Sequence, residues 1–338
     1  MLTVKVITDK AIWEDFILHS SQCSFLQSWN WGVFHESLGH SIFRLGFFND
    51  NQLCGIALLI KINARRATYF ECPAGPVLPW ENQAIIRSVF QFIRQLADKE
   101  AAVFVRIRPN ILKTDQYLNL VISLGLIKAP MHLHAETTWV LNLKDSEETL
   151  LKNMRKNTRY SVKKALNSGV EITSSIKNQD IQTLYRLQLA VAQRRHFVTF
   201  SYNYLLKQFQ AFQPDNQVQL FKASLDNRTL AMAFIIFYGQ EAVYHYAGSS
   251  AEVRQIPVSY ALQWEVIRQA KKKGFPLYNF WGIAPTDNPH HRFAGVTLFK
   301  TGFGGSRVDY LPAHDLVIKP HYWLIYLFES LRRKWRHL

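Results

Sequence analysis

Strand-like and helix-like periods of apolar residues alternate along the whole chain. Residues 3–7, 52–62 and 103–109 have the apolar content of β-strands, and the third segment stops at a proline. Between the last two, residues 82–99 repeat apolar side chains at helical spacing. The first part of the chain therefore predicts an alternation of strands and helices.

The same order of elements restarts near residue 144. Residues 218–225 and 229–239 predict two strands joined by a turn at Asp226 and Asn227, and residues 259–274 predict a helix. Each half runs through helix, strand hairpin, strand, helix and strand. This order is typical of an α+β fold in which a twisted mixed sheet is flanked by helices, so we expect two copies of one fold.

Composition narrows the environment and the partners. The 338 residues include 40 Lys and Arg against 25 Asp and Glu, a net charge of +15, and this excess favours a polyanionic partner. Three cysteines fit no disulfide or zinc framework, the histidines are scattered, and we expect no metal site. The apolar runs are too short to span a bilayer and no secretion signal is evident, so we expect a cytoplasmic protein.

A basic segment at residues 151–168 is the first candidate site. Lys152, Lys156, Arg159 and Lys163 fall on one face of a single predicted helix. Like charges at this spacing destabilise a helix by a few tenths of a kcal/mol per pair, so a face of one sign suggests an anionic partner. The alternative is an ordinary basic surface helix.

Three further segments hold candidate residues. Lys300 lies in FKTGFGG, between a strand-like segment and a glycine turn, although this spacing is not that of a phosphate loop. Arg195 ends a predicted helix, where it suits the helix dipole or offers a fork for phosphate. Trp31, near His35, belongs to an aromatic segment that holds a ligand or, as is more common, forms core.

Several segments together resemble the Fem family of aminoacyl-tRNA-dependent peptidyltransferases. The matching segments are QSWNWGVF (27–34), CPAGPVLP (72–79), MRKNTRYSVKKALNSGVEI (154–172), RRHF (194–197), YHYAGSS (244–250) and FKTGFGG (299–305). The resemblance implies two tandem acetyltransferase-like (GNAT-like) domains, at 1–144 and 145–312. It also implies that the C-terminal segment 313–338 returns to the first domain.

The resemblance implies an activity, its partners and residue roles. An amino acid would pass from aminoacyl-tRNA to an amine of a peptidoglycan precursor, either UDP-MurNAc-peptide or lipid II, without a cofactor. Lys300 would stabilise charge developing at the ester, Arg195 would contact diphosphate, and Tyr246 or Tyr244 would contribute a hydroxyl. The family has a phosphate-binding lysine where this chain has His35, and that departure puts precursor affinity in question.

Two other functions stay open. An acyl-CoA-dependent N-acyltransferase shares the fold, but residues 254–262 have Arg254 followed by Pro257 and Ser259, where a CoA-binding turn has glycines. A non-catalytic nucleic-acid-binding protein would also explain basic charge interleaved with aromatic residues.

The C-terminal residues 321–338 form a basic amphipathic pattern. Trp323, Tyr326, Leu327 and Leu331 share one predicted helical face, and basic residues follow them. Such a segment can make peripheral contact with the inner face of an anionic membrane, or it can pack against the first domain. The sequence leaves the oligomeric state open, with a monomer slightly favoured.

Overall fold

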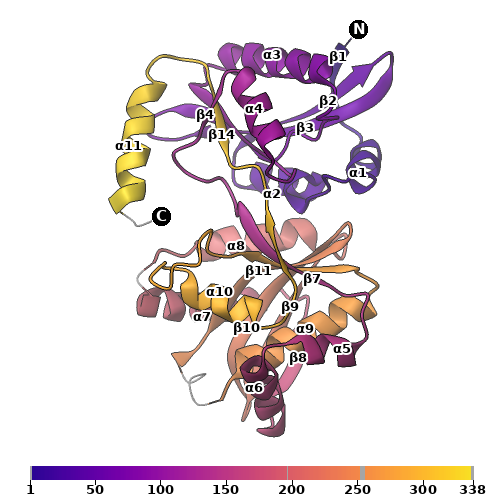
Figure 1. Cartoon of the computed structure of the whole chain (residues 1–338), viewed down its shortest axis with the longest axis vertical. Coiled ribbons are helices and arrows are strands. Elements are labelled where there is room, and N and C mark those ends of the chain that lie inside the picture. Colours follow the sequence, from indigo (N-terminus) through magenta and orange to yellow (C-terminus); the bar gives the residue numbers. More distant parts are fainter. Residues whose placement is uncertain (1, 196, 252–255, 336–338) are drawn as a thin grey trace. The chain divides into compact units, whose positions relative to one another are not determined.

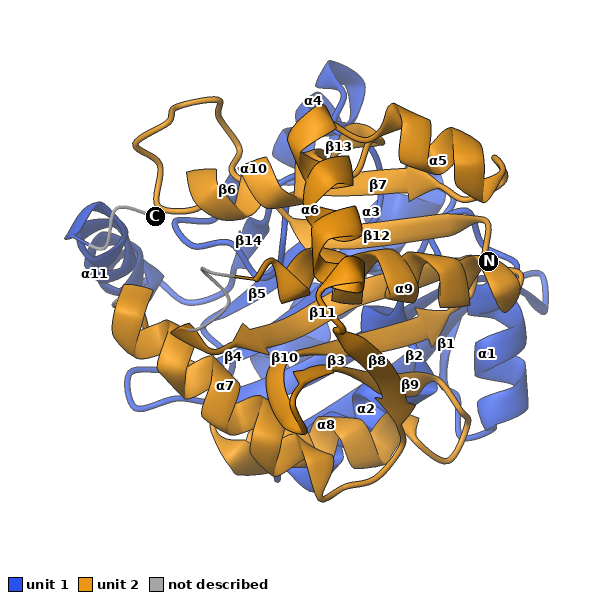
Figure 2. Ribbon diagram, turned by 90° about the horizontal axis from the view of Figure 1, so that it is seen from below, with its two compact units in different colours: residues 1–136, 309–338 blue, residues 137–308 orange. Residues whose placement is uncertain are grey.

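A computed structural model describes residues 2–195, 197–251 and 256–335 (Figure 1). The chain forms two compact units, one of residues 1–136 and 309–338 and the other of residues 137–308 (Figure 2). Each unit holds a seven-stranded mixed sheet with flanking helices. This architecture confirms the predicted α+β class.

Unit 1 is built on the sheet β1-β2-β3-β4-β5-β14-β6. Its strands are β1 (Leu2–Val6), β2 (Ser41–Asn49), β3 (Gln52–Asn63), β4 (Thr68–Ala74), β5 (Phe104–Pro109), β6 (Leu126–Lys128) and β14 (His314–Val317). Its helices are α1 (Lys10–Leu18), the short 3₁₀ helix η1 (Phe25–Gln27), α2 (Trp29–Ser37), α3 (Gln83–Lys99), α4 (Asp115–Ser123) and α11 (Tyr322–Trp335). Helix α3 buries Val89 and Ile93, which recur on one face as the sequence pattern predicts, together with Ile86.

Unit 2 is built on the sheet β13-β7-β12-β11-β10-β9-β8. Its strands are β7 (Thr137–Asn142), β8 (Glu171–Ser175), β9 (Val218–Leu225), β10 (Arg228–Tyr238), β11 (Glu241–Ser249), β12 (Leu277–Gly282) and β13 (Ser306–Asp309). Its helices are α5 (Glu147–Asn153), α6 (Lys156–Asn167), α7 (Asp180–Arg195), α8 (Tyr202–Phe212), α9 (Val258–Lys272) and α10 (Ala294–Thr301). The predicted hairpin turn is present, with positive φ at both Asp226 and Asn227.

The sheet of unit 2 is covered on both faces, as the contacts of its central strand β10 show. Its residues are almost all buried, so the segment is apolar throughout instead of alternating. Ala233 and Ile235 belong to the core that α6 and α9 complete. Phe234, from the opposite face, packs edge to face against Phe209 of α8 at 5.9 Å.

The two sheets have the same spatial order of strands, but the strand next to the parallel pair comes from a different part of the chain in each unit. In unit 1 the parallel pair β4 and β5 is followed by β14, and in unit 2 the parallel pair β11 and β12 is followed by β7. Strand β14 reaches this position from the end of the chain, shown in yellow in Figure 1, and pairs with both β5 and β6.

A buried ion network holds the C-terminal segment in unit 1. Arg106 on β5 donates from Nε and Nη2 to the two carboxylate oxygens of Asp315 on β14, each at 2.8 Å, and Nη2 also contacts Glu329 of α11 at 2.8 Å. The hydroxyl of Tyr322 donates to Asp315 at 2.8 Å, and Asp315 is fully buried. Arg106 and Asp315 are therefore paired with each other, as the desolvation of two buried charges requires.

Three details of the fold differ from the sequence prediction. The boundary between units lies at residues 136/137 and not at 144, because β7 pairs with β12. The predicted basic helix is two helices, since the chain turns at Met154 and Arg155 between α5 and α6. Lys300 lies in the last turn of helix α10, where the sequence suggested a strand-like segment.

The ion network gives a test of how the fold is held. Asp315→Ala is expected to lower the free energy of unfolding by about 3–5 kcal/mol, because it leaves Arg106 buried without its bidentate partner. Glu329→Gln, at a partly exposed position, is expected to cost less than half as much. Urea denaturation of both variants would measure the two losses, and equal losses would contradict the central role of Asp315.

Candidate active site

The parallel strands β11 and β12 separate after a short paired stretch. Only three residue pairs join them, from Glu241 opposite Leu277 to Val243 opposite Asn279. The corresponding strands β4 and β5 of unit 1 stay joined over five pairs. Beyond Val243 and Asn279, the two strands of unit 2 no longer satisfy each other's backbone groups.

A bulge in each strand accompanies this separation. In β11, the register with β10 passes from Tyr244 to Tyr246, so His245 is an extra residue. In β12, the register with β7 shifts between Asn279 and Gly282, and Trp281 has φ +65°. The rings of His245 and Trp281 pack edge to face at 5.4 Å, so the two bulged segments support each other.

Asn279 stabilises the bulge in β12 with its side chain. Its Oδ1 accepts a hydrogen bond from the backbone N–H of Trp281 at 2.8 Å, and its Nδ2 donates to Glu241 at 3.0 Å. A positive φ is unfavourable for a residue as large as tryptophan, so this conformation depends on the surrounding contacts. The carbonyl of the next residue, Gly282, is thereby directed to Lys300.

Lys300 is buried at this point of the sheet. Its Nζ donates to the Gly282 carbonyl at 2.6 Å and lies 5.9 Å from the ring centre of Tyr244. Within the described part of the chain, no carboxylate forms an ion pair with it. Burial without a counter-charge lowers the pKa of Lys300 to about 7.

The two most specific sequence motifs meet around Lys300. Arg155, at the start of α6, donates from Nη1 to the carbonyl of Leu298 at 3.1 Å and from Nη2 to the hydroxyl of Thr301 at 3.0 Å. Its backbone N–H donates to the carbonyl of Gly302 at 2.8 Å. Basic helix α6 therefore begins directly beside the segment that carries the buried lysine.

The glycines of FKTGFGG allow this close packing. A Cβ on Gly302 would lie 2.2 Å from the hydroxyl of Thr158, and one on Gly305 would lie 2.4 Å from the carbonyl of Val140. Gly305 also has φ +98°, a conformation that favours glycine. The motif is thus explained by contacts with α6 and β7 and not by a phosphate loop.

The basic candidates divide into two kinds. Arg159 is half-buried, and its Nη1 donates to the carbonyls of Leu151, Lys152 and Met154, so it ends helix α5. Lys156 and Lys163 are exposed on α6. Lys152 is exposed on α5, so the predicted single face of four cations spans two helices.

The tyrosines near the bulge are half-buried in β11. The hydroxyl of Tyr246 hydrogen-bonds to Tyr204 of α8, and burial raises the pKa of Tyr246. Burial likewise raises the pKa of Tyr244, beside Lys300. Both side chains are therefore hydroxyl donors at neutral pH. Burial lowers the pKa of His245 between them to about 3, so this ring is neutral.

The two arginines at the end of α7 have different surroundings. Arg194 donates to the carbonyl of Ser249 at 2.7 Å and fastens the helix to β11. Helix and strand approach closely there, because a Cβ on Gly248 would lie 2.6 Å from the backbone nitrogen of Gln188. Arg195 is exposed. The sequence could not tell the anchoring arginine from the exposed one.

Trp31 and His35 lie in α2 of unit 1 and are buried. The ring of Trp31 packs against Phe25 at 5.6 Å and His35 at 5.1 Å, as a core residue does. Nδ1 of His35 lies 3.0 Å from Nδ1 of His40, and burial together with His40 lowers the pKa of His35 to about 3. At neutral pH His35 therefore has no positive charge to offer a phosphate.

Arg108 on β5 is a buried cation that the sequence analysis did not select. It is 2% exposed, and its guanidinium lies 5.2 Å from the ring centre of Tyr310. Among the described residues, its Nε and Nη1 have no hydrogen-bond partner. In the sequence, the position of Arg108 within a mostly apolar predicted strand was the one feature that could have indicated its burial.

Comparison with models of protein families shows which family the chain belongs to. A model described as the FemAB family matches residues 8–123, 125–229 and 216–330. The chain belongs to the FemAB family. This membership confirms the family expected from the sequence motifs.

Two curated relatives of the FemAB chain are similar over most of their length. Aminoacyltransferase FemA of Staphylococcus aureus strain MRSA252 is 21% identical, over 85% of this chain and 91% of that protein. Lipid II:glycine glycyltransferase of Staphylococcus saprophyticus is 20% identical over 94% of each.

Solved structures support the tandem fold. The crystal structure of FemX has a TM-score of 0.85 and 18% identity, covering 96% of this chain and 100% of that one. A tandem GNAT protein from the clavulanic acid biosynthesis pathway has a TM-score of 0.61 and 12% identity, covering 95% and 99%. The expected pair of acetyltransferase-like domains is thus confirmed.

The segment compared with a CoA-binding turn is partly described. Arg254 lies outside the described residues, whereas Pro257 directly precedes α9, which begins at Val258. No side chain caps this helix start among the described residues, and Pro257 supplies no N–H for a pyrophosphate.

The burial of Lys300 predicts a specific pH dependence of stability. Below its pKa of about 7 both folded and unfolded chains bind the proton, so the full cost of burying the ammonium is present. Between about 7 and the ordinary value of 10.5, the unfolded chain binds more protons, and stability rises with pH.

Lys300→Met is therefore expected to be more stable than the wild type near neutral pH, with a difference that shrinks toward pH 10. Urea denaturation at several pH values measures this difference. Lys272→Met, at an exposed position of the same unit, should show no such trend. A constant difference for Lys300→Met would contradict the assigned burial of the charge.

Proposed function

We propose that the chain transfers an amino acid from the ester of an aminoacyl-tRNA to the amine of a peptidoglycan stem peptide. The observation that carries the proposal is the buried Lys300 beside the separated strands β11 and β12, with the basic helix α6 beginning next to it. The predicted aminoacyltransferase activity agrees with the names of the FemAB relatives.

The acceptor that we propose is lipid-linked. One relative is named for lipid II as its substrate, and this name is what favours the lipid-linked over the nucleotide-linked precursor. No described helix has the length and apolar character to cross a bilayer. Access to a lipid-linked acceptor would then need peripheral contact, for which residues 321–338 are the candidate.

The reaction needs no further activation of the donor, because the ester is already reactive. The free amine attacks the ester carbonyl carbon, which forms the new C–N bond and a tetrahedral oxyanion. The C–O bond to the terminal ribose then breaks, the released hydroxyl gains a proton, and the nitrogen loses one to solvent or to a substrate group. The products are an amide and a deacylated tRNA.

The role that we propose for Lys300 is to stabilise the oxyanion. A preorganised cation in a site shielded from water interacts more strongly with developing charge than one in solvent. In the free chain the ammonium contacts only the Gly282 carbonyl among the described hydrogen bonds, so it retains donors for a substrate oxygen. An approaching anion favours the protonated form, so substrate binding raises the pKa of Lys300 above about 7.

Helix α6 offers the path for RNA phosphates. Lys156 and Lys163 are exposed on it, while Arg155 fixes its first turn to α10. The acceptor end of a tRNA bound along these cations would therefore lie near the lysine. Arg195 and Tyr246 of the same unit remain our candidates for contacts with the acceptor, with Tyr244 as the alternative to Tyr246.

Replacement of Lys300 tests the chemistry. Lys300→Ala is expected to lower kcat by about 10²–10³-fold with the fold retained. Lys300→Arg keeps a permanent cation, so it should lose the decline in activity that the wild type shows when Lys300 is deprotonated at alkaline pH. Initial rates against pH, with aminoacyl-tRNA and lipid II, measure both effects. A pH profile of Lys300→Arg that declines at alkaline pH in the same way as that of the wild type would contradict the role of Lys300 as the stabilising cation.

Charge reversal on α6 tests the RNA path. Lys156→Glu with Lys163→Glu should weaken binding of a non-hydrolysable aminoacyl-tRNA analogue and reduce the slope of log K against log salt by about 1–2. The helix should persist, because a glutamate at its first position suits the helix dipole. Lys272→Glu with Lys273→Glu is the control, since it changes net charge equally on exposed positions of α9's end. Equal effects of the two pairs would exclude a specific path.

A further inference from the structure

One side of helix α11 is fixed to unit 1. Tyr322 is fully buried and bonded to Asp315, while Glu329 reaches Arg106 at 2.8 Å. Tyr326 packs beside the small core formed by Val103, Phe104 and Tyr322. The orientation of the helix about its own axis is therefore determined, and so is the side that faces away from the unit.

The outward side of α11 is apolar. Its exposed large residues are Trp323 at 55%, Leu324 at 74%, Leu327 at 58%, Leu331 at 58% and Trp335 at 81% exposure. At 100° per residue they occupy an arc of roughly 120°, opposite Tyr322 and Glu329. A continuous apolar strip of this kind, with one tryptophan near each end, is unlike the scattered exposed apolar residues of most protein surfaces.

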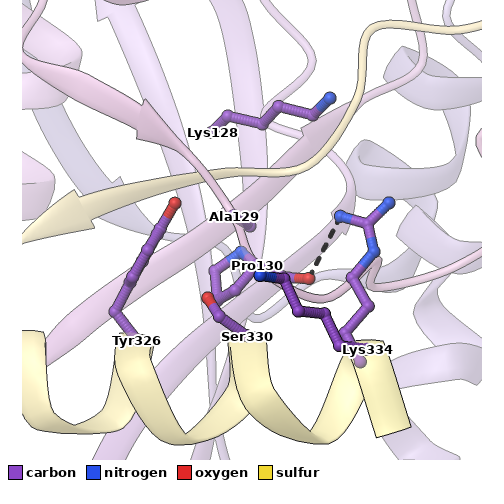
Figure 3. A pocket seen from close by; sticks show the side chains of 7 residues that line it. Lys128, Ala129, Pro130, Tyr326, Ser330 and Lys334 are labelled. Atoms are coloured by element: carbon purple, nitrogen blue, oxygen red, sulfur yellow. Dashed lines mark hydrogen bonds between the residues drawn. The ribbon is translucent and has the colours of Figure 1, made fainter. Parts of the chain in front are cut away.

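A basic pocket lies beside α11 (Figure 3). Its volume is about 370 Å³, and its lining consists of Lys128, Ala129, Pro130, Tyr326, Ser330, Arg333 and Lys334. Arg333 donates from Nη1 to the carbonyl of Pro130 at 3.3 Å, which holds the end of α11 against the loop after β6. Among the described residues the pocket lining contains cations and hydroxyls but no carboxylate, a set suited to phosphate.

We propose that α11 and this pocket bind the surface of an anionic phospholipid membrane. The apolar strip enters the boundary between headgroups and acyl chains, and the pocket receives the phosphate of one lipid headgroup. Charge complementarity selects this occupant, because the last turn of α11 carries Arg332 and Lys334 next to the apolar residues, and Lys128 lines the same pocket as Lys334. A protein partner would need acidic groups matched to these cations.

This inference does not depend on the transfer reaction. If the proposed lipid-linked acceptor is correct, the helix places the chain at the surface where that acceptor lies. If the acceptor is water-soluble, α11 still binds membrane. Binding is therefore measured on vesicles that contain no peptidoglycan precursor.

Flotation of the full chain with phosphatidylglycerol/phosphatidylcholine vesicles tests the proposal. We expect binding to these vesicles and at least tenfold weaker binding to pure phosphatidylcholine. Leu324→Ser with Leu327→Ser should weaken binding about tenfold or more, because both leucines lose apolar area in the membrane. Lys128→Gln with Lys334→Gln should weaken it by about tenfold as well, since two charges near an anionic surface are lost.

Matched controls separate the site from general charge and surface apolarity. Ile122→Ser changes a residue of unit 1 that is 61% exposed, and Lys99→Gln with Lys113→Gln removes two exposed charges of the same unit. These variants should bind as the wild type does. Binding that falls equally in the controls, or that is the same on neutral vesicles, overturns the proposal.

Two further outcomes also overturn it. The first is no flotation on anionic vesicles by a chain that is folded by circular dichroism. In the second, millimolar soluble glycerol phosphate protects Lys128 and Lys334 from chemical acylation, but the chain does not bind vesicles. That result would make the pocket a site for free phosphate. Loss of vesicle binding with unchanged transfer to a soluble precursor would confirm that the two proposals stand separately.

Discussion

The separation of β11 from β12 is the constraint on which the candidate site depends. A parallel pair that continued in register would satisfy the carbonyl of Gly282 within the sheet, and Lys300 would have no place beside it. The extra residues His245 and Trp281 interrupt both strands at the same level and contact each other at 5.4 Å. In unit 1 the equivalent pair stays joined up to Pro109, so repetition of the fold does not repeat this opening.

The position of Lys300 is then set by contacts far from it in sequence. Helix α10 is fastened through Arg155 and Thr158 of α6, and the indole of Trp139 on β7 donates to the carbonyl of Gly304 at 2.6 Å. Side chains larger than hydrogen at Gly302 or Gly305 would push α10 away from these partners. The basic helix and the glycine motif therefore form one structural unit around the lysine.

Much of the fold follows from local pattern, and most of the site does not. The period of apolar residues predicts α3 and β10, and Asp226 with Asn227 predicts a tight hairpin, because these are local preferences. The end of α5 at Met154 could not be predicted, since it is stabilised by Arg159 and Gly302 through tertiary contacts.

Burial of individual polar residues is equally invisible in the sequence. Lys300 precedes a glycine turn and reads as a surface residue, yet it is 6% exposed. His35 occupies the expected phosphate position, yet α2 buries it against His40 and lowers its pKa to about 3. The family resemblance pointed to this lysine as the catalytic candidate, whereas only the structure explains how its ammonium obtains a pKa of about 7.

Two of the buried cations differ in how they are paired, and the difference separates a structural role from the proposed chemical one. Arg106 is surrounded by two carboxylates, so its charge is satisfied within the fold and it holds β14 and α11 in place. Lys300 is given a single carbonyl, and its remaining donors can be satisfied by a substrate oxygen. A buried charge that the fold leaves under-paired lowers stability, and such a cost persists where function requires it. An anion that completes the pairing of Lys300 gains the most where negative charge is greatest, which for an ester under attack is the tetrahedral intermediate.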